Sequence, residues 1–323
     1  MASKENPDLS IVILNYNVRD LVLKCLESVF KHKKPSDKWQ IIVVDNASSD
    51  GSVEAIRKRY GMDSRFRGND KEGGNDEVVE LIASKVNKGF AGGNNLAINK
   101  IKAPVVLFLN PDTIVVNGAI QKSLVYLLGN PDIGAVGCKV EFPDGKLDYS
   151  CHRGFPTPWN AFCYFTGLAN AFPKSPIFAG YTATYLDISK IHEVDCINGA
   201  FLMVRKIAAE QIGFWDEDYF FNGEDIEFCY NLKEKGWKIF FYPEVKIIHY
   251  KGSSSGLQST AQVSVDKERK IRVAKFTTEA MRIFYMKHCY KNYPPILRDL
   301  VLLGIKSLEH YRKFKIVTGL RYE

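Results

Sequence analysis

The chain contains 323 residues, of which 46% are hydrophobic and 25% are charged. This composition excludes a collagen-like or globally disordered chain, and the length accommodates one large α/β domain or one domain with an appendage. The net charge of +7 is uneven: residues 262–323 hold 14 Lys and Arg against 6 Asp and Glu, net +8, whereas the first 261 residues hold 30 against 31, net −1.

Features that report on the cellular compartment point in one direction. Residues 1–10 are polar and show no signal-peptide pattern, and no apolar run reaches the roughly 18 residues that a membrane-spanning helix needs. Seven cysteines are scattered through the chain without a Cys-x-x-Cys pair. This favours free thiols in a reducing compartment over a disulfide framework or a zinc site. We therefore expect a cytoplasmic protein.

Apolar, strand-forming segments alternate with amphipathic helical patterns in the first 140 residues. The predicted strands cover residues 9–14, 41–44, 78–83, 105–109 and 133–140. Each of the first four is followed by a polar turn and by apolar residues at helical spacing, and Asn17 is expected to N-cap the first helix. The alternation predicts an α/β fold with a doubly wound, mainly parallel sheet flanked by helices.

Polar residues stand at the carboxyl ends of these strands, where ligands bind in open α/β sheets. The first strand ends at Asn15, the second at Asp45, and the fourth at the turn Asn110-Pro111-Asp112. An Asn-Pro-Asp turn is also ordinary turn chemistry, so Asp112 alone supports a structural role as well as a binding role. The recurrence of polar strand ends shifts the balance towards a ligand site.

Three segments between the regular elements are distinctive. Residues 63–77 are polar and Gly-rich, which predicts an exposed, flexible loop insertion. Residues 87–95 form a Gly- and Asn-rich loop that opens a helix and can bring backbone amides close to a ligand, although this pattern alone is weak. Residues 151–185 are aromatic and Pro-rich, and they predict either a substrate-facing flap or an irregular connection.

The densest group of acidic and aromatic side chains in the chain lies in residues 214–227. Together with Asp45 and Asp112 and with His249 at a strand end, these carboxylates form an oxygen-rich set that suits Mg²⁺ or Mn²⁺ better than zinc. A packed loop with solvated carboxylates is the alternative. The elements predicted around this group are a strand over 194–204 containing Gly199, a helix over about 224–235, and strands over 239–241 and 245–248.

Seven of these segments, in this order, resemble the successive motifs of family 2 glycosyltransferases with the GT-A fold, and most closely those of the rhamnosyltransferase-like branch. Ordered co-occurrence is far more specific than any single motif. The resemblance spans roughly residues 9–256 and rests on residues 11–17, 44–52, 87–95, 109–112, 198–205, 221–229 and 249–252.

The resemblance implies a role for each matching residue. The donor nucleotide sugar would be held by Asn15, Tyr16, Asp45, Asn94 and Asn110. The turn at residues 110–112 takes the place of the family's Asp-x-Asp motif, with one charge fewer. Asp112 would bind the Mg²⁺ or Mn²⁺ ion that bridges the diphosphate, and His249 would complete the metal site. Asp225 would be the catalytic base, with Glu224 orienting the acceptor or the base.

The function implied is inverting transfer of rhamnose or another hexose to a hydroxyl of a glycan or polyprenyl-linked acceptor in cell-surface polysaccharide synthesis. A dTDP-sugar donor follows from the branch, and a UDP-hexose or UDP-N-acetylhexosamine donor is the alternative. A catalytic domain would cover residues 1–260. A non-catalytic sugar-nucleotide-binding or scaffold subunit of a synthase is the competing interpretation, although a scaffold would be expected to have lost Asp112, Asp225 or His249.

The basic C-terminal extension, residues 261–323, contains apolar residues at helical spacing between its Lys and Arg residues. It predicts amphipathic helices that either pack on the catalytic domain or attach the protein peripherally to the anionic inner face of the cytoplasmic membrane. Nucleic acid is not expected as a partner, because the extension lacks a recognised binding motif and the region before it is acidic.

Overall fold

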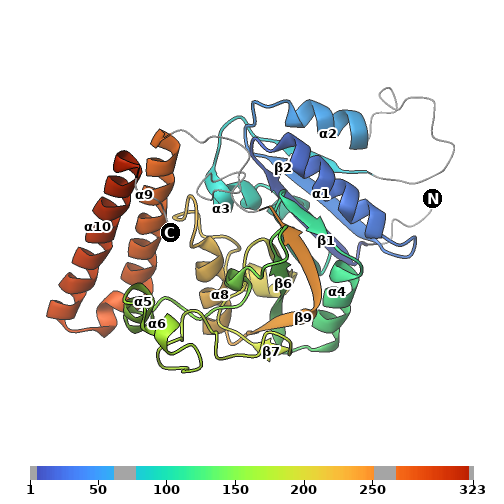
Figure 1. Cartoon of the computed structure of the whole chain (residues 1–323). Helices are drawn as coiled ribbons and strands as arrows, with labels where there is room; N and C mark the ends of the chain where they lie inside the picture. Colours follow the sequence, from blue (N-terminus) through green and yellow to red (C-terminus); the bar gives the residue numbers. More distant parts are fainter. Residues whose placement is uncertain (1–5, 62–77, 251–266, 320–323) are drawn as a thin grey trace.

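The computed structural model describes residues 6–61, 78–250 and 267–319, and the loop insertion predicted at 63–77 therefore lies outside the described residues. Its centre is a nine-stranded sheet in the order β3-β2-β1-β4-β8-β6-β9-β5, with β7 paired to β9 (Figure 1). The strands are β1 (Leu9–Asn15), β2 (Trp39–Asp45), β3 (Glu80–Ala83), β4 (Val105–Leu109), β5 (Thr113–Val115), β6 (Ile133–Glu141), β7 (His192–Glu193), β8 (Phe201–Arg205) and β9 (Lys238–His249).

The sheet is parallel from β3 to β4 and mixed beyond β4. β8 runs antiparallel to both β4 and β6, whereas β6 and β9 are parallel. The central strands are buried on both faces: every residue of β1 is buried, including the apolar run Ile11 to Leu14. Such continuous burial is why these strands appear in the sequence as apolar runs rather than as alternating patterns.

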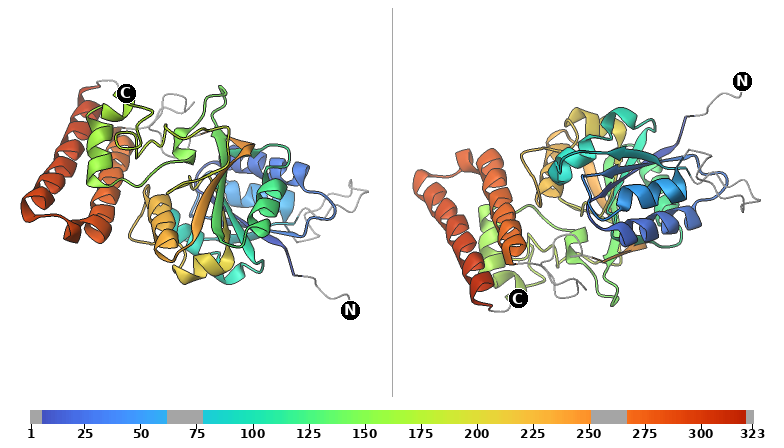
Figure 2. Two further views of the ribbon diagram at one scale, coloured as in Figure 1. Left: turned by 90° about the horizontal axis from the view of Figure 1, so that it is seen from below. Right: turned by 90° about the horizontal axis from the view of Figure 1, so that it is seen from above.

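Helices cover both faces of the sheet. Figures 1 and 2 show α1, α2 and α4 on one face and α3, α7 and α8 on the other. The helices of this region are α1 (Arg19–His32), α2 (Ser52–Tyr60), α3 (Gly89–Asn95), α4 (Ala119–Gly129), α5 (Pro158–Phe165), α6 (Leu168–Ala171), α7 (Lys206–Gln211) and α8 (Glu224–Glu234). The α/β architecture predicted from the alternating pattern is confirmed.

Two strand predictions were wrong in extent. Only Phe201–Arg205 of the predicted 194–204 strand is β-structure, because Asn198 turns the chain by accepting a hydrogen bond from the Ala200 amide at 2.7 Å. The strands predicted at 239–241 and 245–248 are a single strand, β9. Its register against β6 jumps from Tyr242 to Lys246, so Pro243 lies in a bulge, where a missing amide hydrogen is tolerated.

The sequence predicted that Asn17 would be the N-cap of α1, and the structure shows that this prediction was wrong. Val18 occupies the N-cap position, and Asn17 adopts a left-handed conformation with φ of 53°. Its side-chain oxygen accepts a hydrogen bond from the Ser49 amide at 2.7 Å, and its own amide donates to the Ser48 hydroxyl at 2.9 Å. Asn17 therefore ties together the loops that follow β1 and β2.

The C-terminal extension forms a helical hairpin at one end of the molecule, made of α9 (Lys267–Phe284), a π-helical turn (Tyr285–Cys289) and α10 (Pro295–Thr318) (Figure 2). Glu227 of α8, which is 2% exposed, anchors it by pairing with His288 Nε2 at 2.7 Å and accepting a hydrogen bond from the Tyr219 hydroxyl at 2.9 Å. Lys287 adds ion pairs to Asp216 and Asp218. The hairpin thus docks on the helix that carries Glu224 and Asp225.

α10 has apolar residues on two opposite sides. Val301, Leu302 and Ile305 pack in a cluster with Phe284 and Tyr285. Seven large hydrophobic residues are instead exposed: Ile296, Leu297, Leu300, Leu303, Tyr311, Phe314 and Val317. None of the helices in the described part of the chain is both long enough and apolar enough to span a bilayer.

A buried histidine beside β7 makes the stability of the fold sensitive to acid. His152 is fully buried, its ring centroid lies 5.5 Å from that of His192, and neither of its ring nitrogens has a hydrogen-bond partner in the structure. Burial, followed by the neighbouring His192, lowers the pKa of His152 to about 4. In the unfolded chain the pKa of a histidine is about 6.5. Between about pH 4 and pH 6.5, the unfolded state therefore binds a proton at His152, whereas the folded state keeps this side chain neutral.

Stability should therefore fall as pH decreases from about 6.5 to about 4, by up to roughly 3 kcal/mol from this residue. Replacing His152 with Phe should remove that component of the pH dependence. Urea unfolding of both proteins at pH 7.5 and 4.5 measures it, with His310→Gln, at an exposed position of α10, as the control. An identical loss of stability in wild type and His152→Phe would contradict this assignment.

Candidate active site

A cleft of about 900 Å³ opens at the carboxyl ends of β1 and β4 and is closed on the far side by α9. Of the residues selected from the sequence, it is lined by Tyr16, Asn110, Asp112, Glu224, Asp225 and His249. The two groups expected to perform chemistry, the metal pair and the carboxylate pair, thus share one cavity although they are distant in the sequence.

Asn15, Asp45 and Asn94 lie behind the lining rather than in it. All three are buried, and Asn15 Nδ2 donates a hydrogen bond to Asp45 Oδ2 at 2.7 Å. Asp45 Oδ1 accepts from the Ser48 amide at 2.9 Å, and Asn94 Nδ2 donates to the carbonyl of Phe90 at 3.0 Å. In this structure they fix the loops that border the cleft at the ends of β1 and β2 and at α3.

Asn46 is a lining residue that sequence reasoning did not single out. Its side chain donates to Asn87 Oδ1 at 3.0 Å and to the Gly89 carbonyl at 2.9 Å, and it accepts from the Lys88 amide at 2.9 Å. It therefore holds the Gly/Asn loop against the end of β2. The only signal was its place beside Asp45 in a strand-end motif.

Strand pairing explains how Asp112 meets His249. β5 pairs antiparallel with β9 so that Thr113 lies opposite His249, and the Tyr250 amide donates to the Asp112 carbonyl at 2.8 Å. The Asn-Pro-Asp turn is fixed by the Thr113 hydroxyl, which donates to the Asn110 carbonyl at 2.7 Å. Two 4–5% exposed side chains result, with His249 Nε2 at 3.1 Å from Asp112 Oδ1.

This pair offers a divalent cation one carboxylate and one imidazole. Asn110 Nδ2 lies 3.5 Å from His249 Nε2 at the same point. Within the described residues, no three or more His, Cys, Asp and Glu side chains lie together so that they could hold a metal ion. Two protein ligands suit Mg²⁺ or Mn²⁺, because these ions commonly take their remaining ligands from substrate phosphates and water.

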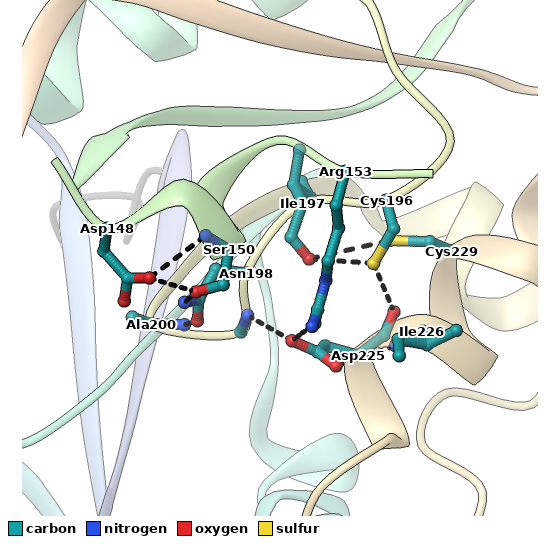
Figure 3. Close-up of polar contacts among 11 residues, drawn as sticks. Asp148, Ser150, Arg153, Cys196, Ile197, Asn198, Ala200, Asp225, Ile226 and Cys229 are labelled. Atoms are coloured by element: carbon teal, nitrogen blue, oxygen red, sulfur yellow. Dashed lines mark hydrogen bonds and ion pairs between the residues drawn. The ribbon is translucent and has the colours of Figure 1, made fainter. Parts of the chain in front are cut away.

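Asp225 lies at the beginning of α8, where Gly223 adopts a left-handed conformation with φ of 85° that glycine takes without strain. Arg153 Nη2 lies 2.6 Å from Asp225 Oδ2, and both side chains are at most 15% exposed (Figure 3). The same oxygen accepts from the Gly199 amide at 3.3 Å, and Asp225 Oδ1 accepts from the Ile226 amide at 2.8 Å. This carboxylate is held rigidly in one orientation.

Arg153 is the main site residue that sequence reasoning missed. Its backbone exchanges two hydrogen bonds with Cys196, at 2.9 and 3.0 Å, which fixes the start of the 151–185 segment beside Gly199. The available signal was compositional: Arg153 and Lys174 are the only Lys, Arg, Asp or Glu residues between Cys151 and Leu186. The beginning of this aromatic segment does line the cleft, through Arg153 and Pro156, and Tyr181 lines it further along the chain.

Glu224 differs from its neighbour in both environment and charge. It is 9% exposed, it lines the cleft, and its Oε2 has no hydrogen-bond partner in the structure. Burial, followed by the negative charge of Asp225, raises the pKa of Glu224 to about 8. At neutral pH the two adjacent carboxyl groups thus divide into one that is paired with Arg153 and one that keeps its proton.

Comparison with known proteins identifies the family. A model described as Glycosyl transferase family 2 matches residues 10–189, more than half of the chain, and one described as Glycosyl transferase family group 2 matches residues 106–292. The chain belongs to glycosyltransferase family 2. Its likeness to curated rhamnosyltransferases agrees with the branch that the motifs indicated.

Two of these relatives illustrate the likeness. The glycosyltransferase is 26% identical over 227 residues to the N-acetylglucosaminyl-diphospho-decaprenol L-rhamnosyltransferase of Mycobacterium tuberculosis, covering 67% of this chain and 68% of that protein. It is 25% identical over 250 residues to the rhamnosyltransferase WbbL of Escherichia coli K12, covering 74% of this chain and 82% of that protein.

Solved structures confirm the GT-A fold of this glycosyltransferase. A mannosyltransferase from Pyrobaculum calidifontis, in complex with GDP-mannose and Mn²⁺, superposes with a TM-score of 0.56 at 17% identity, covering 98% of this chain and 75% of that one. GalNAc-T7 with UDP, GalNAc and Mn²⁺ superposes with a TM-score of 0.54 at 13% identity, covering 98% of this chain and 57% of that one.

Proposed function

We propose that this glycosyltransferase transfers rhamnose or another hexose, with inversion, from a dTDP- or UDP-sugar to a hydroxyl of a glycan or polyprenyl-linked acceptor in cell-surface polysaccharide synthesis. The observation that carries the proposal is the meeting of Asp112 and His249 with Asp225 in one cleft. Both rhamnosyltransferase relatives support rhamnose as the sugar, and the decaprenol-linked acceptor of the Mycobacterium tuberculosis enzyme supports a lipid-linked acceptor.

Asp225 is the base of the reaction. As the acceptor oxygen forms its bond to the anomeric carbon, a carboxylate oxygen of Asp225 takes the hydroxyl proton. The bond between the anomeric carbon and the phosphate oxygen breaks, and its electron pair leaves with the nucleoside diphosphate. A single displacement of this kind inverts the configuration at the anomeric carbon. Arg153 orients Asp225, and the protonated Glu224 is available to donate a hydrogen bond to the acceptor.

Asp112 and His249 would hold the cation. Their fit rests on their separation of 3.1 Å, on their burial and on the oxygen and nitrogen ligands they provide. A bound Mg²⁺ or Mn²⁺ would supply Lewis-acid stabilisation of the departing diphosphate. The structural neighbours solved with Mn²⁺ support a divalent ion. Tyr16, Asn46 and Asn110 line the nucleotide side of the same cleft and orient the donor.

Thermal-shift measurements with UDP, dTDP, GDP and CDP, each with and without Mn²⁺ or Mg²⁺, test the proposal. One diphosphate should stabilise the protein selectively, more strongly with metal, and the Asp112→Ala variant should lose the metal-dependent part. No shift with any nucleotide, in folded protein, would contradict the enzyme and favour a non-catalytic scaffold of a synthase.

A polyprenyl-linked acceptor would be met at a membrane surface, and α10 is suited to contact with such a surface. Its exposed side carries Ile296, Leu300, Leu303, Phe314 and Val317, facing away from α9. At roughly 100° per residue, Lys306 and Lys315 fall on either side of this apolar stripe. An apolar face flanked by lysines favours peripheral binding to the anionic inner face of the cytoplasmic membrane.

Vesicle co-sedimentation measures this contact. The wild type should bind vesicles that contain phosphatidylglycerol and bind neutral vesicles more weakly. Leu300→Glu combined with Leu303→Glu should weaken binding by about tenfold or more, because two apolar side chains leave the interface and two negative charges enter it. Val125→Glu, at an exposed apolar position of α4, is the matched control. Equal binding by both variants would exclude α10 as the contact.

A further inference from the structure

One side of α9 forms a wall of the active-site cleft, which we call the α9 wall. Several contacts fix the position of α9 relative to the start of α8. The Phe276 ring lies 4.8 Å from that of Phe220, and Asn222 Nδ2 donates to the Thr277 hydroxyl at 3.0 Å. Gly223 lies so close to Ala280 that a Cβ there would stand 3.0 Å from the Ala280 Cβ. The α9 wall is thus packed against the residues that immediately precede Glu224 and Asp225.

The chemical character of the α9 wall changes along its length. Towards the carboxyl end of the helix the lining residues are apolar except for Thr277: Val273, Phe276, Ala280, Met281 and Phe284. Towards the amino end they are charged: Glu268, Arg269 and Arg272. The apolar end leads to Phe155, whose ring lies 6.3 Å from that of Phe284, and hence to the aromatic segment and α5.

The middle of α9, at Phe276, lies next to the donor side of the cleft. Phe220, which contacts Phe276, accepts a hydrogen bond through its carbonyl from the Phe90 amide at 2.9 Å. Phe90 belongs to the Gly/Asn loop and α3, whose residues line the nucleotide side. Arg272 lies about one helical turn before Phe276, towards the amino end of α9. Figure 1 shows this end of α9 at the top of the hairpin, opposite the end near α5.

Most charges in the lining compensate one another. Arg153 forms an ion pair with Asp225, and Glu268 and Arg269 contribute one charge of each sign to the net charge of the lining. Glu224 keeps its proton at neutral pH, because burial raises its pKa to about 8. Asp112 is assigned to the cation site. Arg272 lines the cleft, its side chain is exposed, and it forms no ion pair with any residue in the described part of the lining.

We propose that Arg272 binds the diphosphate of the nucleotide sugar and neutralises the charge that develops on the leaving nucleoside diphosphate. This rests on the proposed function. When the bond between the anomeric carbon and the phosphate oxygen breaks, the electron pair stays on that oxygen and adds one negative charge. A guanidinium is always charged and binds phosphate oxygens through two parallel hydrogen bonds, so it favours the departing diphosphate over the intact donor.

Binding of the product nucleotide tests the proposal without depending on activity. Calorimetric titration with dTDP and UDP, in the presence of Mn²⁺, should give a dissociation constant at least tenfold higher for Arg272→Ala than for wild type. Arg272→Lys should fall between them, since it keeps the charge but not the paired hydrogen bonds. Lys275→Ala is the matched control: it removes an exposed cation from the next turn of α9 that does not line the cleft.

The outcomes separate this inference from the proposed function. Loss of nucleotide affinity in Arg272→Ala but not in Lys275→Ala supports the inference. Nucleotide binding that is equal in wild type and Arg272→Ala overturns it. Farnesyl diphosphate, titrated in parallel, then shows whether Arg272 serves the acceptor's diphosphate instead. Failure of the wild type to bind any nucleotide would overturn the proposed function itself, because the cation pair would then have no diphosphate to hold.

Discussion

Replacing Asp225 with Asn should lower kcat by about 10²- to 10⁴-fold with little change in the KM for the donor. The reason is that Asn cannot accept the acceptor's proton, while its side-chain oxygen can still accept from Arg153 and Gly199 and loses only the hydrogen bond from the Ile226 amide. Initial-rate measurements with a saturating nucleotide sugar give both constants. A loss of less than tenfold would mean that another group removes the proton.

The neighbouring Glu224 provides the matched comparison. Because its pKa is raised to about 8, Gln resembles the form in which Glu224 stands at neutral pH. Glu224→Gln should therefore retain most of the activity at pH 7. Above pH 8 the wild type should lose activity as Glu224 ionises beside Asp225, whereas Glu224→Gln should not. If Glu224→Gln loses more activity at pH 7 than Asp225→Asn does, Glu224 rather than Asp225 would be the base.

Replacing Asp112 should abolish the cation dependence of nucleotide binding. Asp112 supplies the carboxylate of the proposed cation site, and His249 alone is a poor partner for Mg²⁺ or Mn²⁺. We expect Asp112→Asn to bind nucleoside diphosphate equally with Mn²⁺ and with EDTA, and its transfer rate to fall by roughly 10²- to 10³-fold, which corresponds to several kcal/mol of lost transition-state stabilisation.

Asn is the preferred substitution because Asp112 is buried and an isosteric amide leaves the packing of the turn intact. Calorimetry of the wild type in EDTA provides the reference, since removing the metal should reproduce the variant. If Asp112→Asn still binds nucleotide more tightly with Mn²⁺, the cation must be held elsewhere, and the pairing with His249 is then only structural.

The extent to which the sequence predicted the structure depends on the range of the interactions involved. Apolar runs such as residues 105–109 end at a polar turn within a few positions, so local pattern was sufficient to place β4 and Asp112. The same holds for the helix that begins at Glu224, after a glycine with left-handed backbone conformation. These elements are determined by periodicity and turn chemistry.

Contacts between distant segments could not be obtained in this way. Asp112 meets His249 only because β5 pairs with β9, across 137 positions of the chain. Arg153 reaches Asp225 across 72 positions of the chain, and its backbone is held by a β-bridge to Cys196. No local sequence pattern predicts this bridge. The antiparallel insertion of β8 between β4 and β6 is also a matter of long-range pairing, which explains why the sheet is mixed beyond its predicted parallel half.

The packing of the C-terminal extension also depends on contacts between segments that are distant in the sequence. The sequence predicted amphipathic helices and left open whether they pack or bind a membrane. The structure packs α9 against the cleft and leaves an apolar side of α10 exposed, and this depends on the burial of His288 against Glu227, 61 positions away. The basic charge of the extension was visible in the sequence, but the position of Arg272 in the wall of the cleft was not.

The most direct test of the mechanism is the anomeric configuration of the product. The enzyme would be incubated with the nucleotide sugar selected by the thermal-shift screen, with Mn²⁺ and with a prenyl-diphosphate-linked N-acetylglucosamine acceptor, and the new linkage would be assigned by NMR. A single displacement with Asp225 as base predicts a configuration opposite to that of the donor sugar. Retained configuration would contradict the proposed arrangement of base, donor and leaving group.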